Sequence, residues 1–141
     1  MSANWCLDIE DMHDKFDVNT TMNELTPNQL AFFLRFKSRN IEREFEKFSD
    51  AKNAEAVVSS LINLCFECVS SLDALGVDTY EAWDRVIASN MAKERQLEPE
   101  STNPLDLPNL IKPEGWIAPT HEDNVGLLSK VVFINTVDYS S

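Results

Sequence analysis

The amino-acid sequence predicts an all-α fold built around one hydrophobic core. Glycine is scarce, with 3 in 141 residues, and several long segments repeat apolar residues at steps of three and four, as one face of a helix does. Few segments alternate apolar and polar residues in the manner of a strand. The hydrophobic fraction of 43% is enough for one core, so we expect a single globular unit of helices.

The chain is expected to begin with a short helix followed by a loop. Residues 7–16 repeat apolar side chains along one helical side, and His13 stands among the acids of that segment. Residues 18–25 are polar, which predicts a loop. Thr26 followed by Pro27 is typical of a helix start, because threonine caps exposed backbone N–H groups and proline has no N–H to leave unpaired.

The second predicted helix spans residues 27–48. Ile41, Phe45 and Phe48 are spaced i, i+4 and i+7, so we expect them to face the core. At about 100° per residue, one flank of that side carries Asn40, Arg43, Glu44 and Lys47, while Glu42 and Glu46 fall on the other.

Three basic residues of this helix lie one turn apart: Arg39, Arg43 and Lys47. Like charges at this spacing repel by a few tenths of a kcal/mol per pair. An ion pair such as Arg43 with Glu46 is one explanation for their presence, and an anion bound above this flank is the other.

Residues 54–76 form the central predicted helix. Its apolar face, which we expect in the core, comprises Val57, Val58, Leu61, Leu64, Cys65, Cys68, Val69, Leu72 and Leu75. Gly76 suits a left-handed C-terminal cap. The other side carries Ser59, Asn63, Phe66 and Ser70, a polar stripe with one aromatic residue, and we expect this stripe to line a solvated pocket.

A fourth helix is predicted from the capping box at residues 78–81. Asn90 lies in its apolar stripe and needs a partner, either a backbone group or a ligand. The five prolines of residues 97–119 predict an extended, wrapping segment, in which Trp116 either stacks on a flat ligand or covers core surface. Residues 131–134 are β-prone and predict an edge strand or an apolar arm on a partner subunit.

Charge and cysteine content restrict the partners and the compartment. The formal net charge of −12 argues against nucleic acid and anionic membrane as partners. A mimic of DNA would also be acidic, but here the acids are interleaved with bases. Three cysteines, without a signal peptide or an apolar run long enough to span a bilayer, predict a reducing cytoplasm. Cys65 and Cys68 are expected to be small core residues rather than zinc ligands.

Several segments in order resemble one protein family. They are DMHDKF, EREFEKF, SSLINLCFECVSSLDALGVD, AWDRVIASNMAKE and IKPEGWIAP, and the resemblance covers about residues 7–119. The pattern resembles the MazG-like, phosphoribosyl-ATP pyrophosphohydrolase-like members of the all-α NTP pyrophosphatase superfamily, which are common in phage genomes. The resemblance implies a helical bundle that forms dimers or tetramers, with a nucleotide pocket between bundle helices. It divides the chain into a helical domain, residues 1–120, and an unmatched C-terminal extension, residues 121–141.

The family's chemistry requires magnesium, held by an E-E-x-x-E motif on one helix and an E-x-x-x-D or D-x-x-x-D motif on the next. The alignment places the first motif on Arg43, Glu44 and Lys47, of which only Glu44 is acidic. It places the second on Ser59 and Asn63, which are neutral. The resemblance therefore implies a pocket without a metal ligand set, in which Arg43 and Lys47 hold a phosphate directly.

Other family positions keep their residue type. These further ligand-binding candidates are Lys37, Arg39, Asn90, Lys93, Lys112 and Trp116. We therefore expect a catalytically inactive protein, without metal or cofactor, that sequesters a phosphorylated nucleotide-type ligand, plausibly as a phage counter-defence sponge in the host cytoplasm.

Two alternatives remain open. One is an active Mg-dependent nucleoside triphosphate pyrophosphohydrolase with a displaced metal site built from Glu44, Glu67 and Asp73. The other is a protein-interaction inhibitor with a vestigial pocket.

Overall fold

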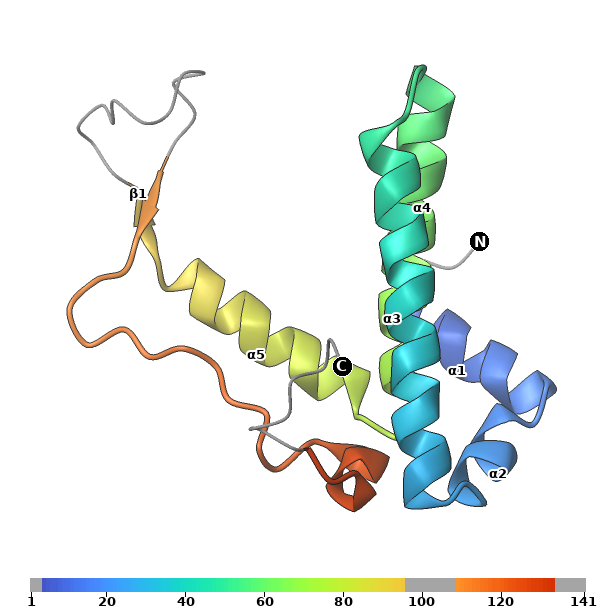
Figure 1. Cartoon of the computed structure of the whole chain (residues 1–141). Coiled ribbons are helices and arrows are strands. Elements are labelled where there is room, and N and C mark those ends of the chain that lie inside the picture. The colour runs from blue at the N-terminus through green and yellow to red at the C-terminus, as the bar shows by residue number, and fades with distance from the viewer. Residues whose placement is uncertain (1–3, 96–108, 134–141) are drawn as a thin grey trace. The chain divides into compact units, whose positions relative to one another are not determined.

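The computed structural model of the chain describes residues 4–95 and 109–133 (Figure 1). Within these residues the chain forms five α-helices, one 3₁₀ helix and a single pair of two-residue strands, which confirms the all-α fold class. The elements are α1 Trp5–Lys15, α2 Val18–Asn23, α3 Pro27–Ser49, α4 Ala54–Ala74, α5 Thr79–Met91, β1 Glu94–Arg95, β2 Leu110–Ile111 and η1 Gly126–Lys130.

The chain forms two compact units, where the sequence predicts one. The first unit comprises Met1–Thr79 with Asn124–Ser141, and the second comprises Tyr80–Asp123. The domain boundary after residue 120 stays a prediction. Most of the extended segment predicted at residues 97–119 lies outside the described residues, because the description resumes only at residue 109.

The helix starts follow the capping residues of the sequence. Thr26 accepts a hydrogen bond from the Gln29 backbone N–H while the Gln29 side chain accepts one from Thr26 N–H, which makes a reciprocal capping box. Pro27 occupies the first turn, as predicted. Asn4 and Asn53 cap α1 and α4 in the same way, each accepting a hydrogen bond from a backbone N–H three residues on.

The predicted loop at residues 18–25 is wrong, because residues 18–23 form α2. Asp17 adopts a left-handed backbone conformation with φ of 54°, which turns the chain sharply between α1 and α2. Met22 is buried at the far end of α2, so tertiary packing stabilises a helix that its polar composition does not favour.

In the first unit, α3 and α4 lie side by side along their length (Figure 1). Their shared seam is partly polar: Lys37 Nζ lies 3.3 Å from Glu67 Oε2, and both side chains are about four-fifths buried. Ser60 and Ser70 of α4 are also buried, with their hydroxyls bonded to carbonyls of their own helix. Small and polar groups therefore fill the seam that an apolar face was expected to fill.

The predicted core face of α4 is only partly buried: Leu75 is buried as expected, and Val57, Leu64 and Val69 are half-buried. Its apolar residues Val58, Leu61, Cys65, Cys68 and Leu72 are exposed in the single chain, although they were expected in the core. Periodicity identifies the apolar face of a helix, but it does not say which surface covers it.

The expected core side of α3 is also largely uncovered. Phe45 is 56% exposed and Phe48 is exposed too, whereas Leu30, near the start of α3, is fully buried. Both long helices of the first unit, α3 and α4, therefore expose apolar surface in the single chain.

A buried acid–imidazole pair attaches α1 to α4. His13 Nδ1 lies 2.6 Å from Asp73 Oδ2, and both side chains are largely buried. Ile9 of α1 is buried beside this contact along the same helix face, one turn before His13. The histidine is thus a satisfied structural side chain.

The segment after residue 123 is anchored at the end of α4. Gly76 has φ of 77°, as expected for a C-terminal cap, and Gly126 has φ of 53°. Leu127 N–H donates to the Leu75 carbonyl over 2.7 Å. Residues 126–130 form η1, and residues 131–133 form no strand, so the edge-strand alternative is wrong over its described part. The other alternative, an apolar arm on a partner subunit, stays a prediction.

The α4 helix has the length and the composition to cross a membrane, with a mean hydropathy of 1.4 over an 18-residue window. This departs from the expectation that no such run exists. Core helices of soluble proteins meet the same criterion but are mostly buried, whereas only 11% of this window is buried inside the chain; α4 is the one helix of the described residues that meets the criterion.

Candidate functional site

The α3–α4 hairpin ends in an open pocket of about 600 Å³, which we call the hairpin pocket. It is bounded by the last turns of α3, the connection between the helices and the first turns of α4, all within the first unit. Its lining residues are Arg43, Glu44, Glu46, Lys47, Asp50, Ala51, Lys52, Asn53, Ala56, Ser59, Ser60 and Asn63. A pocket of this volume is of the size that small-molecule ligands occupy.

The hairpin pocket brings together five of the ligand-binding residues predicted from the sequence: Arg43, Glu44, Lys47, Ser59 and Asn63. Residues four apart on α4 share one face, which is why Ser59 and Asn63 both reach the pocket. The capped start of α4 at Asn53 fixes the first turn of that face. Only the first two residues of the predicted polar stripe line this pocket: Phe66 does not reach it, and Ser70 is buried.

The ionised groups of the hairpin pocket balance one another. The cations are Arg43, Lys47 and Lys52, and the anions are Glu44, Glu46 and Asp50. The pocket is therefore a mixed surface of donors and acceptors and not a purely basic one. Such a surface favours a ligand that carries both negative charge and hydrogen-bond donors.

Glu44 is the most enclosed charged residue of the hairpin pocket. Its Oε1 accepts a hydrogen bond from Lys47 Nζ over 3.1 Å, and its side chain is only 15% exposed. Its Oε2 is buried and has no hydrogen-bond partner within the described part of the chain. An unsatisfied buried acceptor costs about 1–3 kcal/mol, so this oxygen is poised for a donor from outside the chain.

Two cations of the pocket keep bonding capacity. Arg43 Nη2 donates to Asn40 Oδ1 over 3.4 Å, a long contact that uses one of the five guanidinium N–H groups. Neither Arg43 nor Lys52 forms an ion pair with any residue in the ranges 4–95 and 109–133. Both side chains are thus available to an anion.

The arrangement of acids corrects two expectations about α3. Glu46 was expected on the opposite flank, but it lines the same pocket, together with the residues of the connection after α3. The suggested ion pair between Arg43 and Glu46 is not the one that forms. Lys47 pairs with Glu44 instead, three residues apart on one helix face.

Lys37 and Arg39 do not line the hairpin pocket. Lys37 is occupied by Glu67 in the α3–α4 seam and also lies over the Phe33 ring, 5.7 Å from its centroid. Arg39 is exposed on α3. Their predicted role in ligand binding stays a prediction.

The remaining predicted residues belong to the second unit, where three of them form a local cluster. Lys93 Nζ and Lys112 Nζ lie 5.4 and 4.9 Å from the centroid of the Trp116 ring. The indole Nε1 donates to the Ser89 carbonyl over 2.7 Å, which fixes the ring against α5. Asn90 donates to the Val86 carbonyl of its own helix over 2.9 Å, so a backbone group satisfies that donor.

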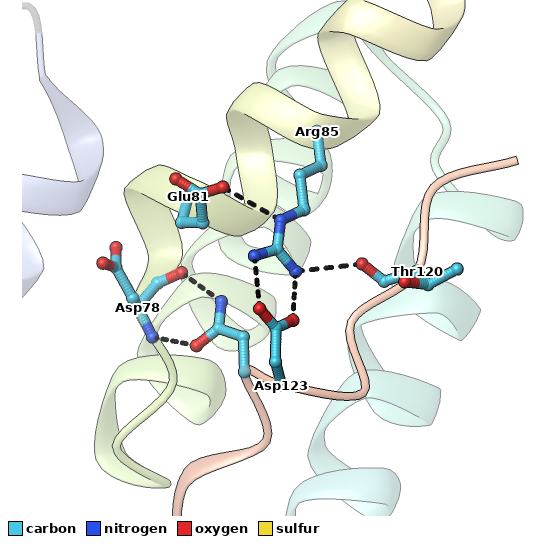
Figure 2. A network of polar contacts seen from close by, with 6 residues as sticks. Asp78, Glu81, Arg85, Thr120 and Asp123 are labelled. Carbon is cyan, nitrogen blue, oxygen red and sulfur yellow. Dashed lines mark hydrogen bonds and ion pairs between the residues drawn. The ribbon is translucent and has the colours of Figure 1, made fainter.

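An ion-pair network also organises the second unit (Figure 2). Arg85 of α5 binds Asp123 through two parallel contacts of 2.7 and 3.0 Å, and it also bonds Glu81 and the Thr120 carbonyl. The hydrogen bonds that Arg85 donates lower the pKa of the Asp123 carboxyl, and their acceptance by Asp123 and Glu81 raises the pKa of the guanidinium. This network ties the segment before residue 124 to α5.

The acids of the proposed displaced metal site are engaged elsewhere. Glu67 is paired with Lys37, and Asp73 is paired with His13. Within the described ranges, no group of three or more histidine, cysteine, aspartate or glutamate side chains is arranged to hold a metal ion. Glu44, Glu67 and Asp73 therefore do not form one site.

Sequence reasoning missed the residues that the helix connection contributes. Asp50 and Lys52 line the hairpin pocket, and Ser60 adds a buried hydroxyl. The signal for the connection is present, because Asn53 before a long apolar repeat marks a helix start and so places residues 50–53 at the hairpin end. The sequence contains no comparable signal for the position of that connection relative to the two helices.

The chain matches no protein-family model, no curated protein and no solved structure. The resemblance to the MazG-like family therefore rests on the sequence segments alone.

Proposed function

We propose that the chain binds a phosphorylated nucleotide-type ligand in the hairpin pocket and holds it without cleaving it. The observation that carries the proposal is the unsatisfied polar chemistry of this pocket, in which unpaired cations lie close to a buried acceptor without a donor. A bound molecule that supplies the missing hydrogen-bond and charge partners would stabilise both the cations and the buried acceptor.

The phosphate end of the ligand is assigned to the cations. Arg43 presents a planar fork of donors that suits a phosphate, and Lys52 adds a compact charge from the helix connection. Ser59 and Asn63 supply neutral donors from the adjacent face of α4.

The other end of the ligand is assigned to Glu44. Its unpartnered Oε2 accepts from an O–H or N–H group, such as a ribose hydroxyl or the amino group of a base. A ligand with phosphates alone leaves the Oε2 atom of Glu44 without a donor. A nucleotide carries anionic and donor groups at separate positions, which suits the mixed charge of the lining.

The absence of turnover is inferred from the acids themselves. Phosphoryl chemistry of the family that the sequence resembles needs several carboxylates directed at Mg²⁺. Here one oxygen of Glu44 is already bonded to Lys47. We therefore favour a MazG-like protein that has kept a pocket and lost the metal, with capture of a nucleotide signal in a phage-infected cell as its biological role.

The test is a depletion assay with the full chain. The purified protein is mixed with a panel of nucleoside triphosphates, cyclic nucleotides and ADP-ribose-type molecules plus Mg²⁺, and the solution is analysed by mass spectrometry before and after heat denaturation. We expect one class to disappear from solution and to return unchanged. A monophosphate with pyrophosphate identifies the active enzyme instead, and no depletion at all favours an interaction protein with a vestigial pocket.

Two matched variants locate the site. Arg43→Glu reverses a charge in the pocket and should abolish depletion, whereas Arg35→Glu makes the same change at an exposed position of α3 outside the lining and should not. Glu44→Gln keeps the size of the side chain and should weaken binding by removing the charged acceptor, roughly tenfold for one charge-assisted hydrogen bond. Equal binding by Arg43→Glu and wild type refutes the assignment of the pocket.

A further inference from the structure

Two thiols lie next to each other on the exposed side of α4. Cys65 and Cys68 are three residues apart and both are exposed, although we expected them in the core. Residues at this spacing are neighbours on a helix surface, with about 5–6 Å between their Cβ atoms. The pair, which we call the α4 dithiol, is therefore accessible to a ligand in the single chain.

The two sulfurs are within electrostatic reach of each other. Desolvation raises the pKa of the Cys68 thiol, and the neighbouring Cys65 and Glu67 raise it further. Glu67 is itself paired with Lys37, so it is not free to act as a third ligand. A cation between the sulfurs would remove the repulsion between two thiolates.

The α4 dithiol lies in an apolar stripe that offers few oxygen ligands. Ser71, the polar residue one turn after Cys68, donates its hydroxyl to the Glu67 carbonyl. The other residues one turn from either cysteine are apolar: Leu61, Ile62, Leu64, Val69 and Leu72. Hard cations such as Mg²⁺ and Ca²⁺ prefer oxygen ligands, whereas soft cations prefer thiolates. The surroundings of the dithiol therefore favour a soft cation.

The number of ligands decides which soft cation fits. Zinc sites in proteins use four protein ligands, or three with a water molecule. Within residues 4–95 and 109–133, no group of three or more histidine, cysteine, aspartate or glutamate side chains is arranged to hold a metal ion. Zn²⁺ therefore lacks ligands here. Cu⁺ is a soft ion that accepts two thiolates in a linear arrangement.

The spacing suits a bridging ion better than a disulfide. A disulfide needs Cβ atoms about 3.5–4.5 Å apart, which is closer than residues three apart on a helix come. At about 2.3 Å for each metal–sulfur bond, a linear ion bridges sulfurs about 4.6 Å apart. Each sulfur stands one C–S bond from its Cβ, so the ion can join the two thiolates without unwinding α4.

We propose that the α4 dithiol binds one Cu⁺ ion, which Cys65 and Cys68 hold as two thiolate ligands. Binding releases the two thiol protons and leaves the oxidation states of copper and sulfur unchanged. The site uses none of the residues that line the hairpin pocket, so the proposal does not depend on the ligand of that pocket.

The test is a competition for Cu⁺ under anaerobic conditions, with the full, reduced chain in a Cys6→Ser background that removes the third cysteine. The chromophoric Cu⁺ chelator bicinchoninate reports the copper that the protein removes, and native mass spectrometry gives the copper bound per chain. We expect one Cu⁺ per chain. Cys65→Ser or Cys68→Ser should weaken binding by on the order of a hundredfold or more, because losing even a group that only orients a metal ligand costs about 10–100-fold.

A matched variant separates chelation from thiol content. Cys68→Ser combined with Val58→Cys keeps two thiols at exposed positions, but they lie seven residues and about 10 Å apart along the helix axis. This variant should bind Cu⁺ as weakly as Cys68→Ser alone. Because the substituted positions on α4 are exposed, all variants should keep the helical circular dichroism of the Cys6→Ser parent.

The other outcomes of this experiment overturn the proposal. Equal copper in the parent and in both serine variants identifies an adventitious ion only. A parent that takes no Cu⁺ from the chelator shows that the α4 dithiol is not a copper site. Full binding by the variant with Val58→Cys shows that the three-residue spacing is not needed. One copper shared between two chains, or a preference for Zn²⁺, contradicts a two-coordinate site on one helix.

Discussion

Substitution of Gly126 by alanine tests how the chain is held to the end of α4. A Cβ atom at residue 126 would overlap the Leu75 carbonyl oxygen and lie 2.7 Å from the carbonyl carbon of Gly76. These are backbone atoms, so no side chain can rotate to make room. The segment must instead move away from α4.

The cost follows from what that movement breaks. It removes the hydrogen bond from Leu127 N–H to the Leu75 carbonyl and uncovers the half-buried Leu127 and Leu128. A hydrogen bond of this kind contributes about 1 kcal/mol and partial exposure of two leucines about 1–3 kcal/mol. We therefore expect Gly126→Ala to lower the free energy of unfolding by about 2–4 kcal/mol beyond the cost of its positive φ.

Gly76→Ala supplies the matched control. Gly76 also has a positive φ, of 77°, but its nearest neighbours to an added Cβ are at 3.9 Å, an ordinary contact. Both variants pay the left-handed penalty of about 1 kcal/mol, and only Gly126→Ala adds the overlap. The measurement is urea unfolding followed by far-ultraviolet circular dichroism. Equal losses of stability in the two variants would refute the reasoning, because the overlap would then have no energetic consequence.

Three further predictions concern single contacts. His13→Ala should lower stability by about 1–3 kcal/mol in urea unfolding, because it leaves the buried Asp73 carboxylate without its partner, and Asp73→Asn should cost less since no charge is stranded. In a carboxyl NMR titration, Asp123 should titrate below the ordinary aspartate range and return to it in Arg85→Gln. Because this pKa is lower in the folded chain than in the unfolded chain, the ion pair stabilises above the unfolded pKa and is lost as pH falls through the folded one. Trp116→Phe should keep an aromatic ring at this position but lose the hydrogen bond to the Ser89 carbonyl. In wild type, this bond should protect the indole N–H from hydrogen exchange.

The predictions on Asp73 and Asp123 each have an outcome that contradicts them. Equal losses from His13→Ala and Asp73→Asn would mean that no charge is stranded at residue 73. An unchanged Asp123 titration in Arg85→Gln would mean that the guanidinium is not the cause of the lowered pKa.

Local signals in the sequence were sufficient for the helix limits. Thr26, Pro27 and Asn53 act within one helical turn, so their effect does not depend on distant parts of the chain. The same holds for Gly76, whose positive φ is a local property of the helix end. Residues 18–23 show the limit of this reasoning, since their helix depends on the burial of Met22 against other elements.

The hairpin pocket gathers five of the eleven ligand-binding residues predicted from the sequence, and their role in binding stays a prediction. Arg43, Glu44 and Lys47 meet Ser59 and Asn63 because neighbouring helices of a hairpin bring the end of one to the start of the next. Helix periodicity alone did not place Glu46, because the pocket at the end of the hairpin is lined by residues from both flanks of α3 and from the connection. Nor could periodicity reveal that α4 faces outward, because that depends on which surface is available to cover it.

The outward-facing α4 has a consequence for the colloidal behaviour of the protein. At neutral pH the formal charge of −12 makes the chains repel one another, which opposes contact between their exposed apolar side chains. Near pH 4.4, the isoelectric point of the sequence, this repulsion vanishes while the apolar stripe persists. The protein should then aggregate and become turbid over a narrow acidic pH range. Ile62→Glu should shift the pH at which turbidity begins, because it removes part of the exposed apolar surface.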